Sequence, residues 1–166
     1  MRARLASTAV VGLVVGATLV AGCGGDDRPS TSEAGKQLAS WGAELEEPVL
    51  GGLGATQPWT VAEDAGKDVR GACPEDEARR RFAATASVKG DGSTDTDLES
   101  TRLTGALERV GWDAELPGSD TSAASVTASR RGEDATGAKV EVTFAPAGGG
   151  WSYQVTLRTA CLPTSS

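Results

Sequence analysis

Four stretches of the chain alternate between apolar residues and mostly polar ones, a period-two pattern typical of β-strands that bury one face. The stretches are 81–90, 124–129, 139–144 and 151–158. Short turns at 131–137 and 146–150 connect the last three, and such short connections favour antiparallel hairpins. One side of the predicted sheet therefore packs on the protein interior, and the other side meets solvent or a partner.

Two other stretches have the three-to-four-residue spacing of amphipathic helices. The first spans 33–47 and is expected to end before Pro48, because proline cannot donate a backbone hydrogen bond. Its apolar face consists of Ala34, Leu38, Trp41 and Leu45. The second helix opens with Thr96-Asp97-Leu98-Glu99, which matches a capping box with Thr96 as the cap, and Gly111 is a natural stop.

These elements predict an α+β fold, with an antiparallel sheet of about four to five strands and two helices packed on one face. A short strand is expected to start at Trp112. The segment from Gln57 to Cys73 is expected to be irregular or to contain a short extended piece. Residues 33–166 are predicted to form this single domain.

The first 22 residues predict a secretory signal peptide that is removed from the mature chain. Arg2 and Arg4 provide its positively charged start, and an apolar stretch rich in small residues follows over 5–21. A membrane-spanning helix is the competing interpretation. The stretch is at the short end for such a helix and contains Gly12 and Gly16, so the signal peptide is favoured.

The sequence Val20-Ala21-Gly22-Cys23 resembles the lipobox of bacterial lipoproteins, in which a branched apolar residue and two small residues precede a cysteine. The resemblance implies diacylglycerol on the Cys23 sulfur, cleavage before Cys23, and a lipid anchor on the extracytoplasmic face of the cell membrane. Residues 24–32 are small and polar. Residues 23–32 are therefore predicted to be a lipidated, flexible tether.

Lipidation of Cys23 leaves Cys73 and Cys161 as an even pair. In an exported chain such a pair predicts a structural disulfide. Metal binding is the alternative, but two distant cysteines in a chain without histidine make a poor site. The C-x-x-C motif of redox centres is absent.

The overall layout resembles small actinobacterial lipoproteins of the LppA-like sort. The shared features are the lipobox, an N-terminal helix, Cys73 before a strand, an amphipathic helix that ends near Gly111, and a last strand that closes at Cys161. Such lipoproteins have no well-defined activity. The resemblance therefore implies a fold and a location, and carries no activity over to this chain.

The formal net charge of −7 becomes more negative when Arg2 and Arg4 are removed with the signal peptide. Such a chain lacks the basic surface that nucleic-acid binding needs. The charge also disfavours broad adhesion to anionic lipid headgroups. Contact with the membrane is therefore expected to come from the lipid anchor.

No catalytic residue, cofactor or metal site is predicted. Without histidine, a Ser-His-Asp or Cys-His arrangement and an imidazole zinc site are impossible. The acidic residues of 91–99 alternate like those of a calcium loop. However, Thr96 stands where that loop needs glycine, and Arg102 stands where it needs a bidentate glutamate.

Two features could bind a ligand. Arg79, Arg80 and Arg81 form a basic cluster that could hold phosphate, sulfate or an acidic partner, or could be solvated and balance the acidic residues at 75–77. Trp151 could lie exposed on the open sheet face and mark a partner surface, or could belong to the core.

The leading functional hypothesis is a non-enzymatic, membrane-anchored domain that binds an envelope protein or a small ligand. The alternative is a carrier of a small molecule or lipid with an interior pocket, which requires an apolar cavity of several hundred cubic ångströms. A hydrolase or other enzyme is the third hypothesis, and a cleft with converging carboxylates would favour it.

Overall fold

The alternating stretches form strands of one open antiparallel sheet in the computed structural model, which describes residues 28–51, 58–89, 95–115, 124–132 and 134–164. The strands are β1 (Thr60–Val69), β2 (Glu77–Lys89), β3 (Trp112–Glu115), β4 (Ser125–Arg130), β5 (Lys139–Ala147), β6 (Gly150–Arg158) and β7 (Leu162–Pro163). Their order across the sheet is β1-β2-β6-β5-β4-β3, and β7 pairs with the start of β2.

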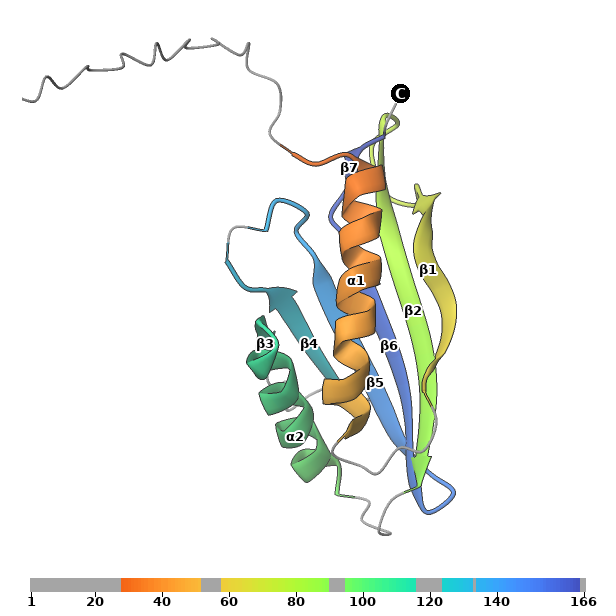
Figure 1. Ribbon diagram of the computed structural model, residues 1–166, viewed down its shortest axis with the longest axis vertical. Helices are drawn as coiled ribbons and strands as arrows, with labels where there is room; N and C mark the ends of the chain where they lie inside the picture. The colour runs from red at the N-terminus through yellow and green to blue at the C-terminus, as the bar shows by residue number, and fades with distance from the viewer. Residues whose placement is uncertain (1–27, 52–57, 90–94, 116–123, 133, 165–166) are drawn as a thin grey trace, which may run out of the picture.

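Two helices, α1 (Thr31–Leu50) and α2 (Thr96–Arg109), lie on the same face of this sheet (Figure 1). The first packs mainly on β1 and β2, and the second packs on β3 and β4. The predicted α+β class, with two helices and an antiparallel sheet, is therefore confirmed.

The described residues contain seven strands, so the predicted number of four to five is wrong. The main addition is β1, where an irregular segment was expected. Only Ala65 is buried in this strand, and two irregularities interrupt its register with β2. An edge strand of this kind has no period-two pattern to detect. The other addition, β7, is only two residues long.

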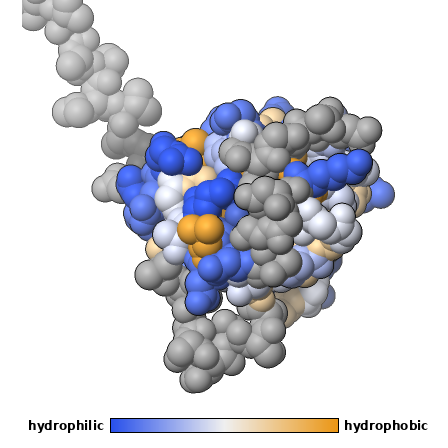
Figure 2. All heavy atoms as spheres, turned by 90° about the horizontal axis from the view of Figure 1, so that it is seen from below, coloured by the Kyte–Doolittle hydropathy of each residue, from blue (hydrophilic) through white to orange (hydrophobic). Residues whose placement is uncertain are grey.

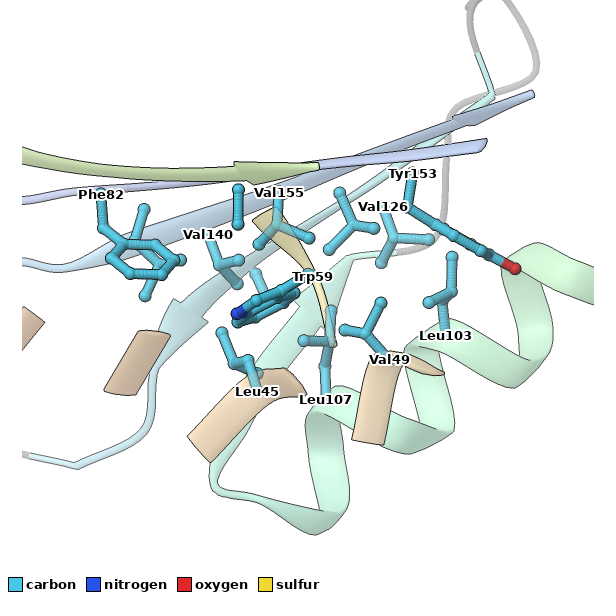
Figure 3. Close-up of a cluster of buried hydrophobic side chains, with 14 of the residues drawn as sticks. Leu45, Val49, Trp59, Phe82, Leu103, Leu107, Val126, Val140, Tyr153 and Val155 are labelled. Carbon is cyan, nitrogen blue, oxygen red and sulfur yellow. The ribbon is translucent and has the colours of Figure 1, made fainter. Parts of the chain in front are cut away.

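The core lies between the helices and the apolar face of the sheet (Figure 3). Leu45 and Val49 of α1 and Leu103 and Leu107 of α2 point toward the valines of the central strands. All of these leucines and valines are buried. Along β6, the buried Tyr153, Val155 and Leu157 alternate with more exposed residues, which confirms the predicted face.

The helix α1 is longer at both ends than the predicted 33–47. Ser30 caps its N-terminus and forms a capping box with Glu33, so the helix begins within the predicted tether. At the other end it continues through Pro48 to Leu50. Pro48 removes one backbone donor from the helix, and the burial of Val49 and Leu50 favours the extra turn nevertheless.

The N-cap of α2 lies one residue before the predicted position. Asp95, rather than Thr96, is the N-cap, and its carboxylate accepts hydrogen bonds from the backbone N–H groups of Asp97 and Leu98. Glu99 is therefore free to turn inward and is buried. Gly111 follows the helix with φ of 86°, which agrees with its predicted role as a stop.

The predicted disulfide between Cys73 and Cys161 is present, with 5.6 Å between the two Cα atoms. It joins the segment before β2 to the segment before β7, 88 residues apart in sequence. In the loop-entropy model, a crosslink of this span stabilises the folded chain by about 4–5 kcal/mol.

Glycine allows α1 to approach the sheet closely at two positions. A Cβ atom on Gly42 would lie 2.7 Å from ring carbons of Phe82, and one on Gly35 would lie 2.9 Å from the carbonyl oxygen of Ala65. Both glycines are buried. Their lack of side chains therefore sets the distance between the helix and strands β1 and β2.

We expect Gly42→Ala to lower the free energy of unfolding by about 1–2 kcal/mol, because overpacking against Phe82 outweighs the better helix propensity of alanine. The matched control is Gly105→Ala in α2, where nothing lies within 4 Å of the added carbon. That variant should be more stable by about 0.5–1 kcal/mol. Urea denaturation measures both changes. Equal effects in the two helices would contradict the close approach.

Candidate functional site

The described residues contain neither a membrane-crossing helix nor a group of three potential metal ligands. Neither described helix is long and apolar enough to span a bilayer. No three His, Cys, Asp or Glu side chains in the described part converge on a point where an ion could bind. The predicted signal peptide, the predicted lipidation site at Cys23 and the first half of the acidic stretch 91–99 lie outside the described residues.

The basic cluster predicted at Arg79–Arg81 does not form one patch, because alternation along β2 puts Arg80 on the face opposite Arg79 and Arg81, and each side chain has a different partner. Arg80 pairs with Asp68 at 3.0 Å, and its Nη1 donates to the carbonyl of Ala65. Arg81 pairs with Glu63 at 2.7 Å, and Arg79 donates to the sulfur of Cys161. Each arginine has its own partner, so the structure does not bring them together for a ligand.

Trp151 is buried, so it does not lie on the open sheet face as proposed for a binding residue. Its ring packs edge-on against Phe144 with 5.7 Å between the centroids. Trp151 is on the same side of β6 as Tyr153 and Val155, the side that the helices cover. The alternative interpretation of this residue, a place in the core, is the correct one.

The uncovered face of the sheet carries short polar side chains. One row crosses five paired strands and consists of Thr60, Thr85, Gln154, Thr143 and Ser125. These residues are exposed or half-buried. The end of the molecule opposite the start of α1 is also mostly hydrophilic, with small separate apolar spots among its described residues (Figure 2). Neither surface presents a broad apolar patch for docking.

A buried polar cluster joins both helices to the sheet at the C-terminal end of α1. The Tyr153 hydroxyl donates to Glu99 at 2.7 Å, and Arg102 donates to both oxygens of the same carboxylate. Arg102 Nη2 also donates to the carbonyl of Val49 at 2.8 Å. These bonds satisfy the carboxylate, the phenol and a free carbonyl of the helix end. Their arrangement indicates a structural role.

Arg130 is the centre of another cluster, beside Trp41 in the middle of α1. The guanidinium of Arg130 lies over the rings of Trp41 and Trp112, with 5.0 and 5.3 Å from Cζ to their centroids. Its Nη1 donates to the carbonyl of Val110, at the C-terminus of α2, where the helix dipole favours a cation. Among the described residues, no carboxylate is paired with Arg130.

The other nitrogens of Arg130 make no hydrogen bond within the described part of the chain, and they are not among its buried unpartnered atoms. Nε and Nη2 are therefore accessible to solvent or to a ligand. Beside them, Arg131 Nε donates to Asp113 at 2.7 Å. Both of these side chains are more than half exposed, so the bond is screened and contributes little.

These residues line a surface groove of about 410 Å³ between the N-terminal half of α1 and the β4–β5 connection. Its lining includes Pro29, Gln37, Trp41, Arg130, Arg131 and Thr136. The connection is held in place by Asp134, whose carboxylate accepts from the hydroxyl of Thr136 and from the N–H of Ala138. We refer to this site as the Trp41–Arg130 groove.

A larger hollow, of about 670 Å³, runs along β1 and is lined by residues 61–69 and Arg81. It lies on the exposed edge of the sheet, and its charged side chains are engaged locally by the Glu63–Arg81 and Asp68–Arg80 pairs. The bulged backbone around Ala65, which has φ of 64°, makes this edge a poor template for another strand. Most charged groups of its lining are engaged within this edge, so the hollow is the weaker candidate.

The Trp41–Arg130 groove is thus the strongest candidate site, and sequence reasoning missed it. The Arg130-Arg131 pair after a predicted strand was a signal for it. Its meeting with Trp41, 89 positions earlier, depends on the packing of α1 against the end of β4. No protein-family model, curated protein or solved structure matches the chain. Its function therefore has to be argued from this geometry and from the sequence motifs.

The buried cluster predicts how Tyr153 responds to alkaline pH. Burial, and then the hydrogen bond to the negatively charged Glu99, raise the pKa of Tyr153 above its ordinary value of 10.0. The folded state therefore keeps the phenol proton at pH values where the unfolded chain loses it. Stability that is present below the ordinary pKa is lost as the pH rises above it.

Tyr153 is the only tyrosine of the chain, so the ultraviolet absorbance of phenolate reports on this group alone. We expect phenolate to form above the ordinary pKa in the folded protein and at the ordinary pKa in urea. Glu99→Gln removes the neighbouring charge and should lower the midpoint in the folded state. Ionisation of the wild type at the ordinary value, with the fold intact by circular dichroism, would show that the cluster does not form.

Proposed function

We propose that this chain is an extracytoplasmic lipoprotein, anchored through Cys23 to the cell membrane, whose domain binds a ligand and catalyses no reaction. The lipobox-like sequence Val20-Ala21-Gly22-Cys23 after an apolar stretch is the observation that carries the anchor. Its resemblance to small actinobacterial lipoproteins of the LppA-like sort supports the same location.

The cysteine chemistry supports an oxidising compartment. Of the three cysteines in the chain, Cys73 and Cys161 are joined in a disulfide. Such bonds persist in exported proteins and are rare in the cytosol. The pairing also leaves Cys23 as the one cysteine outside the disulfide, which is what a residue reserved for lipid requires.

The Trp41–Arg130 groove is the observation that carries the binding function. It combines an aromatic ring with guanidinium N–H groups that are not used by described residues, beside a loop that Asp134 holds in place. Pre-positioned donors next to an apolar ring are the usual composition of a ligand site. The groove is lined by no histidine or cysteine, and Asp134 is its carboxylate.

The carrier hypothesis has less support. It requires an apolar interior cavity, whereas side chains from both helices and the central strands fill the space over the covered face of the sheet (Figure 3). The largest hollow described above is at the β1 edge and is lined by charged residues. It does not resemble the apolar chamber of a lipid carrier.

The anchor is tested by Cys23→Ala in cells, because alanine cannot form the thioether to diacylglycerol. We expect an unprocessed precursor, or release of the chain from membranes washed at high salt, which screens ionic contacts. The control is the double variant Cys73→Ala/Cys161→Ala, which should keep both the lipid mass and membrane retention. A cleaved Cys23→Ala chain that stays on washed membranes like the wild type would contradict the anchor.

Binding is tested by photo-crosslinking in intact cells from position 135, an exposed residue at the groove, with Gln154 on the uncovered sheet face as the matched position. Adducts should form at position 135 and be reduced by Trp41→Ala. Adducts that form only at position 154 would show that the ligand binds the uncovered face of the sheet and not the groove. Failure of both positions to form any adduct would contradict a binding function.

A further inference from the structure

The distance that the tether can span places the groove close to the membrane. Six residues separate Cys23 from Pro29, and an extended chain covers at most about 3.3–3.6 Å per residue, or about 20 Å in total. Pro29 itself lines the groove. An anchor on Cys23, as proposed above, therefore keeps the groove within about 20 Å of the lipid it carries.

The orientation of the fold agrees with this placement. The start of α1, the β4–β5 connection and β7 lie toward one end of the molecule, and the start of α2 lies toward the other (Figure 1). Arg28, just before α1, pairs with Glu77 at the start of β2 at 3.2 Å. This contact ties the beginning of the folded chain to the β7 end, so a short tether presents that end to the bilayer.

The groove has the side chains that bind a phospholipid headgroup. Guanidinium groups form charge-assisted hydrogen bonds to phosphate oxygens, and Arg130 has Nε and Nη2 available for them. Arg131 lines the rim of the groove and adds a second positive charge nearby, while its guanidinium is held by Asp113 and by the carbonyl of Trp112. Trp41 is half-buried, and tryptophan favours the boundary between headgroups and acyl chains.

The net charge of −7 argues against general adhesion to an anionic surface, so such a contact has to be local. A free anion would have no reason to lie near the tether. The headgroup layer, by contrast, supplies phosphate at high local concentration within the distance that the tether allows. Position and charge complementarity therefore both favour a lipid phosphate over one in solution.

We propose that the Trp41–Arg130 groove binds the phosphate of an anionic phospholipid in the membrane that holds the anchor, and so orients the domain on the bilayer. This inference rests on the proposed lipid anchor. The headgroup phosphate binds Arg130 in the groove, with Arg131 at its rim, and the opposite end of the domain points away from the membrane. The anchor and the groove then fix two points of the same molecule at the surface.

The test uses the unlipidated chain from residue 24, because the sheet, the core and the disulfide lie wholly within 28–164. Its flotation with phosphatidylglycerol vesicles is compared with its flotation with phosphatidylcholine vesicles at low salt. We expect a preference for phosphatidylglycerol that decreases with added salt. Arg131→Gln should weaken this binding about fivefold, the effect of one basic residue near an anionic surface.

Two variants make the test specific. Asp113→Asn removes the carboxylate that competes for Arg131 and should strengthen vesicle binding. Arg158→Gln makes the same change of charge as Arg131→Gln but on the exposed face of β6, so it should leave binding unchanged. Thermal unfolding checks that each variant is folded. Arg130 is not altered because its contacts with both tryptophans support the fold.

The proposal is overturned if Arg131→Gln and Arg158→Gln weaken binding equally, since the contact would then be a general charge effect. It is also overturned if the chain does not bind the vesicles, including the case in which it binds inorganic phosphate alone, which would identify a free anion as the ligand. The chain from residue 24 carries no lipid, so its vesicle binding tests the groove alone. The anchor is tested independently by Cys23→Ala, and either proposal can fail without the other.

Discussion

The close packing of α1 on β2 is the contact on which the other parts of this structure depend. Alternation in β2, β6, β5 and β4 leaves one side of the sheet apolar, and that side has to be covered to be removed from water. Gly35 and Gly42 let the helix approach until its backbone nearly touches Ala65 and Phe82. With α1 at this distance, α2 fits beside it over β3 and β4, and Trp41 reaches the end of β4.

The clusters around Arg102 and Arg130, at the end and in the middle of α1, show how similar residues can have different roles. Arg102 is committed within the protein, because Glu99, Tyr153 and the end of α1 use its donors. Removing one member of such a buried set leaves a charge without a partner, which typically costs about 3–5 kcal/mol. Arg130 is held in place by two rings and one carbonyl, and this leaves donors for a ligand. Accessible donors, rather than the presence of arginine, distinguish the candidate site.

The disulfide and the proposed anchor act on the same part of the molecule. The bond between Cys73 and Cys161 fixes the segments that precede β2 and β7, and Arg28 pairs with the first residue of β2. A domain pulled by a lipid on Cys23 would experience that force at this crosslinked end. The proposed headgroup contact adds a second point of attachment nearby, which would convert a loose tether into a defined orientation.

Much of the fold could be predicted because it depends on local pattern. The alternation in β2, β4, β5 and β6 and the spacing of Leu38 and Leu45 reflect which residues are buried, and burial follows the period of the backbone. The disulfide followed from the number of cysteines. The edge strand β1 was missed because only Ala65 is buried in it, and the cap of α2 was misplaced because Asp95 and Thr96 are both good capping residues.

The sequence by itself determined the α+β class, the covered face of the sheet, the disulfide and the motif at Cys23. Each of these depends only on the pattern of neighbouring residues or on the number of residues of one type. Only the tertiary structure decided which arginines have partners. Strand alternation put Arg80 on the face opposite Arg79 and Arg81, whose partners differ, and the same alternation directed the Trp151 side chain into the core. The Trp41–Arg130 groove arises where a helix, a strand end and a loop meet. No local pattern specifies such a meeting, because it depends on how the distant segments pack.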